Sequence, residues 1–284
     1  MGAAPDPVRA QQRLILALGG HEFSRRRGNE AIVEYMLALA PRERPRICLL
    51  PTASGDASEQ IAAFRSALGA RACELSELSL FRLEDSPIPV AEHILAQDMV
   101  YVGGGSMVNL LAIWRAHGID RILVEAWRRG VVLCGQSAGA MCWFEAGISR
   151  SVGSATTVEG LGVVPGALSV HHHRDPDRRL ALLDLVRRRG GRAYGVDDGA
   201  GLVIRGGRVA SAISGVDGAG AWLVVRTADG EVEERPIESA PLPAPREAID
   251  EVGADVAELR RVMASRAGRS GATAAAWSRR RPGS

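Results

Sequence analysis

Short runs of consecutive apolar residues alternate with amphipathic segments along most of this chain. Residues 13–20 and the apolar run after Pro45 are typical of buried strands, while residues 29–40 place their apolar side chains on one helical face. The same alternation predicts helices at 59–69, 108–117, 119–129 and 181–189, and strands at 75–81, 97–102, 130–134 and 193–197. Strands that alternate with helices predict an α/β fold with a doubly wound, mostly parallel sheet flanked by helices.

Toward the C-terminus the pattern changes to short strands separated by glycine turns. Residues 200–236 therefore predict antiparallel hairpins at the C-terminal edge of the sheet. Pro241, Pro243 and Pro245 indicate a linker, and residues 246–264 have helical spacing. We expect a flexible tail at 1–12, one α/β domain over 13–238, a linker and C-terminal helix over 239–264, and a disordered tail at 265–284.

Composition narrows the class of partner. The chain has 284 residues, of which 46% are hydrophobic, so it is long enough to bury a core. Its formal net charge of +2 gives no reason to expect nucleic acid or a charged membrane surface as a partner. Since no apolar run approaches the roughly 20 residues of a membrane span and the N-terminus lacks a signal-peptide core, we expect a cytoplasmic protein.

Cysteine and lysine usage excludes several chemistries. The four cysteines form no CxxC pair, which favours free thiols over disulfides. The chain has no lysine, so all 35 basic residues are arginine. This excludes a Walker-type phosphate loop, a Schiff-base lysine and a Ser–Lys hydrolase.

The strongest chemical signal is a glycine-flanked serine. The run VVLC is followed by Gly135-Gln136-Ser137-Ala138-Gly139 and then by AMCWFE, which we expect to be a helix. A G-x-S-x-G turn between a strand and a helix is the nucleophile elbow of serine hydrolases. The helix N-terminus would place the Ala138 N–H beside the serine hydroxyl as an oxyanion donor. The alternative is an ordinary glycine-rich turn.

A serine nucleophile needs a base and a carboxylate that orients the base. Three consecutive histidines, 171–173, are the leading candidates for the base, and on an extended segment only His171 and His173 would share a face. A zinc site is the rival interpretation, but neither HExxH nor CxxC supplies further ligands. Asp197 and Asp198 end a short strand before a glycine, and the residues alone do not decide between a catalytic carboxylate and a turn.

A second glycine run, residues 103–105, follows the predicted strand 97–102. Its spacing does not fit a G-x-G-x-x-G dinucleotide loop, because Val108 stands where the third glycine belongs. Backbone N–H groups in such a run are free to bind an anion, so we interpret it as the second half of an oxyanion hole, with a tight turn as the alternative.

Four ordered blocks, VYVGGGSMVNLL, VVLCGQSAGAMCWF, LGVVPGALSVHH and YGVDDGAGLVI, resemble the dipeptidase E family over roughly residues 13–235. These are aspartyl dipeptidases related to cyanophycinase, with a fold similar to class I glutamine amidotransferases. The resemblance implies Ser137 as the nucleophile, His171 as the base and Asp198 as the carboxylate that completes the triad. In the family the base lies six residues after the proline of its block, here Pro165. It also implies Gly105 and the Ala138 N–H as the oxyanion hole.

The resemblance further implies hydrolysis of small peptides, including Asp-X dipeptides, through an acyl-enzyme without metal or other cofactor. An acidic substrate side chain needs a cation nearby, which Arg178 or Arg179 could provide, with a solvated helix face as the alternative for these arginines. Gln136, where relatives carry an apolar or aromatic residue, would influence substrate preference. His172 remains an alternative base, because many relatives have a Pro-His-Tyr-type segment here. An esterase or amidase with the same triad, or a non-catalytic binding domain of this fold, stays open, as does a homodimer.

Overall fold

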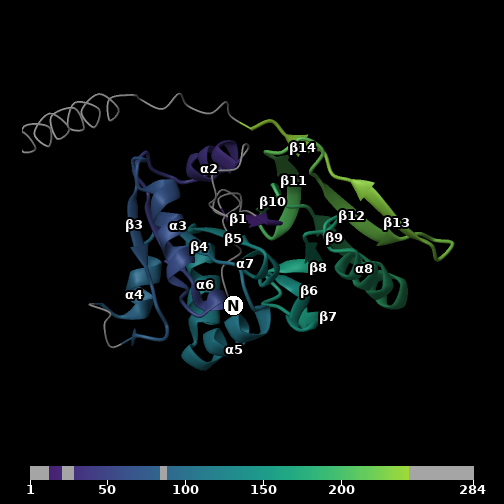
Figure 1. Ribbon diagram of the computed structural model, residues 1–284, viewed down its shortest axis with the longest axis horizontal. Helices are drawn as coiled ribbons and strands as arrows, with labels where there is room; N and C mark the ends of the chain where they lie inside the picture. Colours follow the sequence, from purple (N-terminus) through teal and green to yellow (C-terminus); the bar gives the residue numbers. More distant parts are fainter. Residues whose placement is uncertain (1–12, 21–28, 84–87, 243–284) are drawn as a thin grey trace, which may run out of the picture. The chain divides into compact units, whose positions relative to one another are not determined.

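Two β-sheets and the helices around them make up the computed structural model, which describes residues 13–20, 29–83 and 88–242 (Figure 1). All these residues fall in one structural unit. In the described part, no helix is long and apolar enough to cross a membrane. The predicted helix at 246–264 and both predicted tails lie outside the described residues.

The first sheet has eight strands in the order β14-β11-β10-β1-β5-β4-β2-β3. Five neighbouring strands, β1, β5, β4, β2 and β3, run parallel, as predicted. Beside β1, β10 and β11 add an antiparallel hairpin. The bounds are β1 Leu14–Leu18, β2 Arg46–Leu50, β3 Glu74–Glu77, β4 Met99–Val102, β5 Val132–Gln136, β10 Ala200–Arg205, β11 Arg208–Ser214 and β14 Ser239–Ala240.

Side chains alternate between the two faces of this sheet, because successive residues of a strand point to opposite sides. Leu14, Leu16 and Leu18 of β1 pack in a cluster with α2 (Asn29–Ala38) and α3 (Ser58–Leu68). Ile15 and Ala17 pack on the opposite face, in a cluster shared with the second sheet. That face also carries the helices α4 Val90–Leu95, α5 Met107–His117, α6 Ile119–Arg128 and α7 Ala138–Met141.

The second sheet has six strands in the order β13-β12-β9-β8-β6-β7. One face packs on the shared cluster, and the other is covered by α8 (Pro176–Arg189), which lies on the side of Figure 1 away from α3 and α4. The bounds are β6 Phe144–Val152, β7 Ser154–Glu159, β8 Val164–Val170, β9 Arg192–Val196, β12 Ala221–Arg226 and β13 Val232–Pro236.

The α/β class with helices on both faces of a mostly parallel sheet is confirmed, and two local predictions need correction. The expected helix AMCWFE is wrong, because α7 is a single turn and β6 begins at Phe144. The hairpins at 200–236 form, but β10–β11 join the first sheet, while β12–β13 join the second sheet, where β12 pairs with β9.

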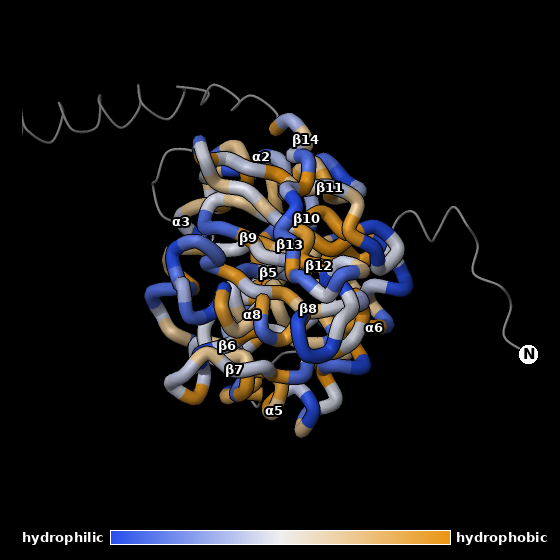
Figure 2. The backbone as a smooth tube through the Cα atoms, turned by 90° about the vertical axis from the view of Figure 1, so that its right-hand side faces the viewer, coloured by the Kyte–Doolittle hydropathy of each residue, from blue (hydrophilic) through white to orange (hydrophobic). Residues whose placement is uncertain are grey.

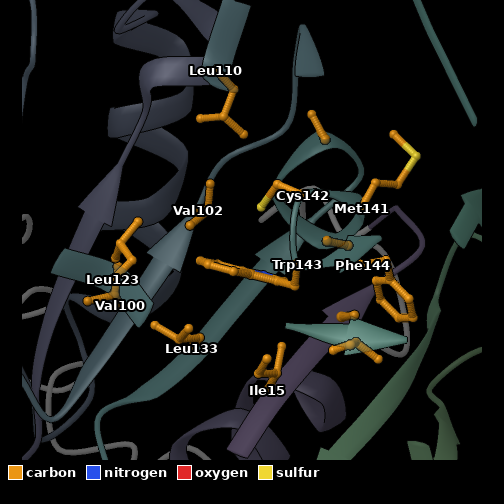
Figure 3. Close-up of a cluster of buried hydrophobic side chains, with 14 of the residues drawn as sticks. Ile15, Val100, Val102, Leu110, Leu123, Leu133, Met141, Cys142, Trp143 and Phe144 are labelled. Atoms are coloured by element: carbon orange, nitrogen blue, oxygen red, sulfur yellow. The ribbon is translucent and has the colours of Figure 1, made fainter. Parts of the chain in front are cut away.

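Trp143 lies at the centre of the cluster between the two sheets (Figure 3). It is fully buried, with its ring centroid 5.8 Å from that of Trp114 in α5. Residues of both sheets and of α5–α7 surround it, so its burial ties the segment after the elbow to the first sheet. Hydropathy colouring places hydrophobic stretches along inner strands such as β10, with hydrophilic stretches on outer loops (Figure 2).

Candidate active site

Ser137 occupies a sharp turn between β5 and α7. Its φ of 51° and ψ of −112° lie in a region that residues with a side chain rarely adopt, as a nucleophile elbow requires. A Cβ on Gly135 would lie 2.1 Å from the Gly139 carbonyl oxygen, and one on Gly139 would lie 2.3 Å from the Val102 carbonyl oxygen. Both flanking glycines are therefore required by close backbone contacts, and the hydroxyl stays half-buried at the carboxyl end of the strand.

His171 lies directly after β8, with its Nε2 3.1 Å from Ser137 Oγ. A positive φ of 55° turns the chain there and ends the extended segment. The argument for an extended segment, on which at most His171 and His173 share a face, therefore does not apply, and the three histidines contact three different partners. The side chain of His171 stays 25% exposed, so its imidazole is in contact with solvent.

The Asp198 carboxylate contacts the other imidazole nitrogen, His171 Nδ1. Its second oxygen accepts a hydrogen bond from Arg174 Nη1 at 2.9 Å. Burial raises the pKa of the Asp198 carboxyl, but the hydrogen bonds from His171 and Arg174 outweigh burial and hold this pKa below its ordinary value. Asp198 is thus ionised at neutral pH and faces the imidazole.

Gly20, at the end of the segment after β1, brings the first sheet against this pair. It forms an isolated parallel bridge with Asp198, and its carbonyl accepts from the Gly199 N–H at 3.1 Å. A Cβ at Gly20 would lie 2.0 Å from Asp198 Oδ1 and 2.8 Å from His171 Cε1. Only glycine fits here. The sequence analysis missed Gly20, whose signal was a second glycine directly after a buried strand.

The neighbouring residues of both segments have other partners. His172 is fully buried, with Nε2 2.6 Å from Glu234 Oε1, and its ring stacks on Trp222. Asp197 accepts hydrogen bonds from the backbone N–H of His173 and from its Nδ1, each at 3.0 Å. Of the candidates that the sequence left open, the structure brings His171 and Asp198 together with Ser137 and places His172 and Asp197 in these contacts.

The glycine run lies beside the elbow. A Cβ on Gly104 would be 3.4 Å from Ser137 Cβ, and Gly105 has a φ of 144° that brings it against the Ala53 carbonyl. Among the described residues, the N–H groups of Gly105 and Ala138 donate to no backbone or side-chain acceptor. Two unpaired donors beside a serine hydroxyl can bind the oxygen of a polarised carbonyl group.

The three predicted substrate residues are placed differently. Gln136 is buried between the elbow and the glycine run, and its Oε1 has no hydrogen-bond partner in the described chain. Arg178 keeps 12% of its side chain exposed and lies 3.2 Å from Asp175, with Nη1 unpartnered among described residues. Arg179 is instead paired with Glu234, which holds its guanidinium beside His172.

Metal-binding groups of three or more His, Cys, Asp or Glu side chains do not occur among the described residues. Each of the three consecutive histidines faces a different carboxylate or hydroxyl. The four cysteines are free, as expected. The arrangement offers a hydroxyl, an imidazole, a carboxylate and two amide donors, which are the functional groups that acyl transfer requires.

Known proteins with related sequences and structures are peptidases. The sequence model of peptidase family S51 matches residues 15–212. An uncharacterized peptidase of Bacillus subtilis (strain 168), YgaJ, is 40% identical over 224 residues, which are 78% of this chain and 96% of that protein.

Two solved structures share the fold. A peptidase from an acI-B1 Actinobacterium has a TM-score of 0.56 at 19% identity and covers 81% of this chain and 96% of its own. A putative peptidase E protein from Listeria monocytogenes EGD-e has a TM-score of 0.52 at 17% identity, over 69% and 96%. The chain belongs to peptidase family S51, the dipeptidase E family, and is a serine-type peptidase.

Proposed function

We propose that this peptidase hydrolyses small peptides through a Ser137–His171–Asp198 triad and an acyl-enzyme. The contact that carries the proposal is the 3.1 Å approach of Ser137 Oγ to His171 Nε2, with Asp198 on the opposite imidazole nitrogen. An ionised carboxylate there favours the tautomer with a proton on Nδ1, which leaves Nε2 free to accept the serine proton.

In the proposed reaction, Ser137 Oγ attacks the peptide carbonyl carbon while His171 Nε2 takes the hydroxyl proton. The carbonyl oxygen gains negative charge and accepts hydrogen bonds from the Gly105 and Ala138 N–H groups. His171 then gives its proton to the leaving amine as the C–N bond breaks. Water, deprotonated by His171, attacks the ester carbonyl, and His171 returns this proton to Ser137 Oγ as the Oγ–C bond breaks and the carboxylic acid leaves. Asp198 stabilises the charged imidazole in each half of the reaction.

An acidic residue at the substrate's N-terminal position, as in Asp-X dipeptides, is the specificity that we propose. Arg178 supports it, because its Nη1 lacks a partner in the described chain, and a substrate carboxylate would supply one. Arg179 is less suited, since Glu234 binds both its Nε and its Nη2, whereas Asp175 contacts only the Nε of Arg178. Gln136 lies next to the elbow, and we propose that it shapes the same pocket.

A dipeptide panel assayed with the wild type and with Ser137→Ala tests the proposal. We expect hydrolysis that is lost in Ser137→Ala, and labelling of the wild type alone by a fluorophosphonate. Activity that survives in Ser137→Ala would reject the triad. Preferential cleavage of simple esters over every peptide would favour an esterase.

Arg178→Met tests the acidic preference. We expect it to reduce kcat/KM for Asp-X dipeptides at least tenfold more than for Ala-X dipeptides. Arg179→Met is the matched control, because it removes the same charge from the adjacent residue of α8 and should leave this ratio unchanged. Equal losses on both substrates in Arg178→Met would contradict the assignment.

A further inference from the structure

Gln60 of α3 contacts the glycine run although it lies more than forty residues earlier in the chain. Its Nε2 donates a hydrogen bond to the Gly104 carbonyl at 3.2 Å, and its Oε1 lies 3.1 Å from the Ser54 hydroxyl. A carbonyl oxygen has no proton to give, so only the NH₂ group of the amide can face Gly104. The side chain is half-buried and its orientation is set at both ends.

The peptide between Gly104 and Gly105 is the part of the run that needs such a contact. Backbone bonds hold both ends of the run, from Gly103 N–H to the Leu50 carbonyl at 3.1 Å and from Ser106 N–H to the Ala53 carbonyl at 2.8 Å. Glycine on both sides removes the Cβ clashes that normally oppose rotation of a peptide plane. Among described residues, no backbone N–H donates to the Gly104 carbonyl, so Gln60 supplies its protein hydrogen bond.

The carbonyl of Gly104 and the N–H of Gly105 belong to one trans peptide, so they point in opposite directions. A group that holds the carbonyl on the Gln60 side therefore directs the N–H to the other side. If the plane rotated by half a turn, the carbonyl oxygen would take the place of the N–H and would repel the developing negative charge of a substrate oxygen.

We infer that Gln60 is a positioning residue of the oxyanion hole, which keeps the Gly105 N–H directed at the reacting carbonyl. The inference rests on the proposed function, in which Gly105 is an oxyanion donor. Gln60 does not touch the substrate; it acts through the Gly104–Gly105 peptide. Its loss should therefore impair the chemical step and leave ground-state binding almost unchanged.

Gln60→Met tests this, because it keeps the length of the side chain and removes the donor. Loss of one oxyanion donor costs about 10²–10³ in rate, which is the upper limit here. We expect kcat to fall by about 10–10²-fold with KM changed less than threefold. The affinity for a peptide aldehyde, which forms a tetrahedral adduct, should fall by the same factor. Dipeptide binding measured in a Ser137→Ala background should not change.

Gln60→Glu adds a pH readout that a merely structural role would not give. Its carboxylate cannot donate to the Gly104 carbonyl, whereas the protonated acid can. The activity relative to wild type should therefore be lowest at pH 8 and should recover toward pH 5, close to the ordinary pKa of about 4.3 for glutamate. A deficit that is independent of pH would contradict the inference.

Gln97→Met is the matched control, because Gln97 also donates its amide to a backbone carbonyl, that of His93 at 2.9 Å in α4. It should leave kcat unchanged. The inference would be overturned if Gln60→Met kept both the thermal unfolding temperature and the kcat of the wild type while Ser137→Ala had no activity. Activity that survives in Ser137→Ala would instead reject the proposed function.

Discussion

Gly20→Ala is expected to inactivate the enzyme without touching any proposed catalytic group. Gly20 does not have a positive φ, so alanine meets no backbone strain there, and the effect of the substitution is steric. The added Cβ would lie 2.0 Å from Asp198 Oδ1 and 2.8 Å from His171 Cε1, both far inside van der Waals contact. The carboxylate must move away, and the imidazole loses the group that orients it.

Loss of the orienting carboxylate costs about 10⁴ in kcat in serine proteases, whose triad has the arrangement that we propose here. A displaced carboxylate retains part of its effect, so we expect kcat to fall by about 10²–10⁴-fold in Gly20→Ala. The assay is steady-state hydrolysis of the best dipeptide of the panel, together with the rate of fluorophosphonate labelling, which reports the reactivity of Ser137 directly. Both rates should fall together.

Gly153→Ala is the control for a glycine-to-alanine substitution that causes no clash at the site. Gly153 has a φ of 95° between β6 and β7 and no atom within 4 Å of an added Cβ, so the substitution introduces strain without a clash. It should cost about 1–3 kcal/mol of unfolding free energy and leave kcat intact. Gly20→Ala with kcat within threefold of wild type, in a protein that still unfolds cooperatively, would refute the steric argument.

Three further predictions concern titration and thiol access. Burial lowers the pKa of His172 below its ordinary 6.5, so the unfolded chain takes up the proton at a higher pH than the folded protein does, and the free energy of unfolding should fall as pH drops below 6.5. The urea midpoint should therefore be lower at pH 5.5 than at pH 7.5, and this difference should be smaller in His172→Phe. The lowered pKa of Asp198 stabilises the native state at pH values above 3.8, the pKa in the unfolded chain, and this contribution is lost as pH falls through the lower pKa of the folded state. In Asp198→Asn the free energy of unfolding should therefore depend less on pH below 3.8. Burial raises the thiol pKa of Cys48 to about 12 and also raises the pKa values of the buried Cys134 and Cys142. A disulfide reagent should therefore react with at most one thiol, that of Cys73, in the native protein and with four after denaturation. More than one fast-reacting thiol in the native protein would contradict the packing.

Sequence reasoning located the elements whose signal is local. The strands of the first sheet are continuous apolar runs, and the elbow carries its own glycines, so β1, β5 and Ser137 were predictable. The strands β6–β8 were not predicted. Their burial depends on α8, which covers their outer face, and this partner comes later in the chain.

The rest of the site depends on contacts between distant segments. Nothing in the local pattern assigns a positive φ to His171, the histidine that faces the serine in the structure. The choice of Asp198 over Asp197 came from family resemblance; in the structure Asp198 contacts His171 and Asp197 contacts His173. Gly20 and Gln60 acquire their importance only when β1 and α3 are placed beside other loops, which a lone sequence does not show.

The hydroxyl and the imidazole at the site are contributed by different sheets: Ser137 ends a strand of the first, and His171 ends a strand of the second. If Ser137 and His171 act as proposed, a nascent or damaged molecule whose two layers have separated carries both side chains without the contact that activates the hydroxyl. On that proposal, hydrolysis begins only when the tertiary structure is complete, and incompletely assembled copies do not cleave peptides around them.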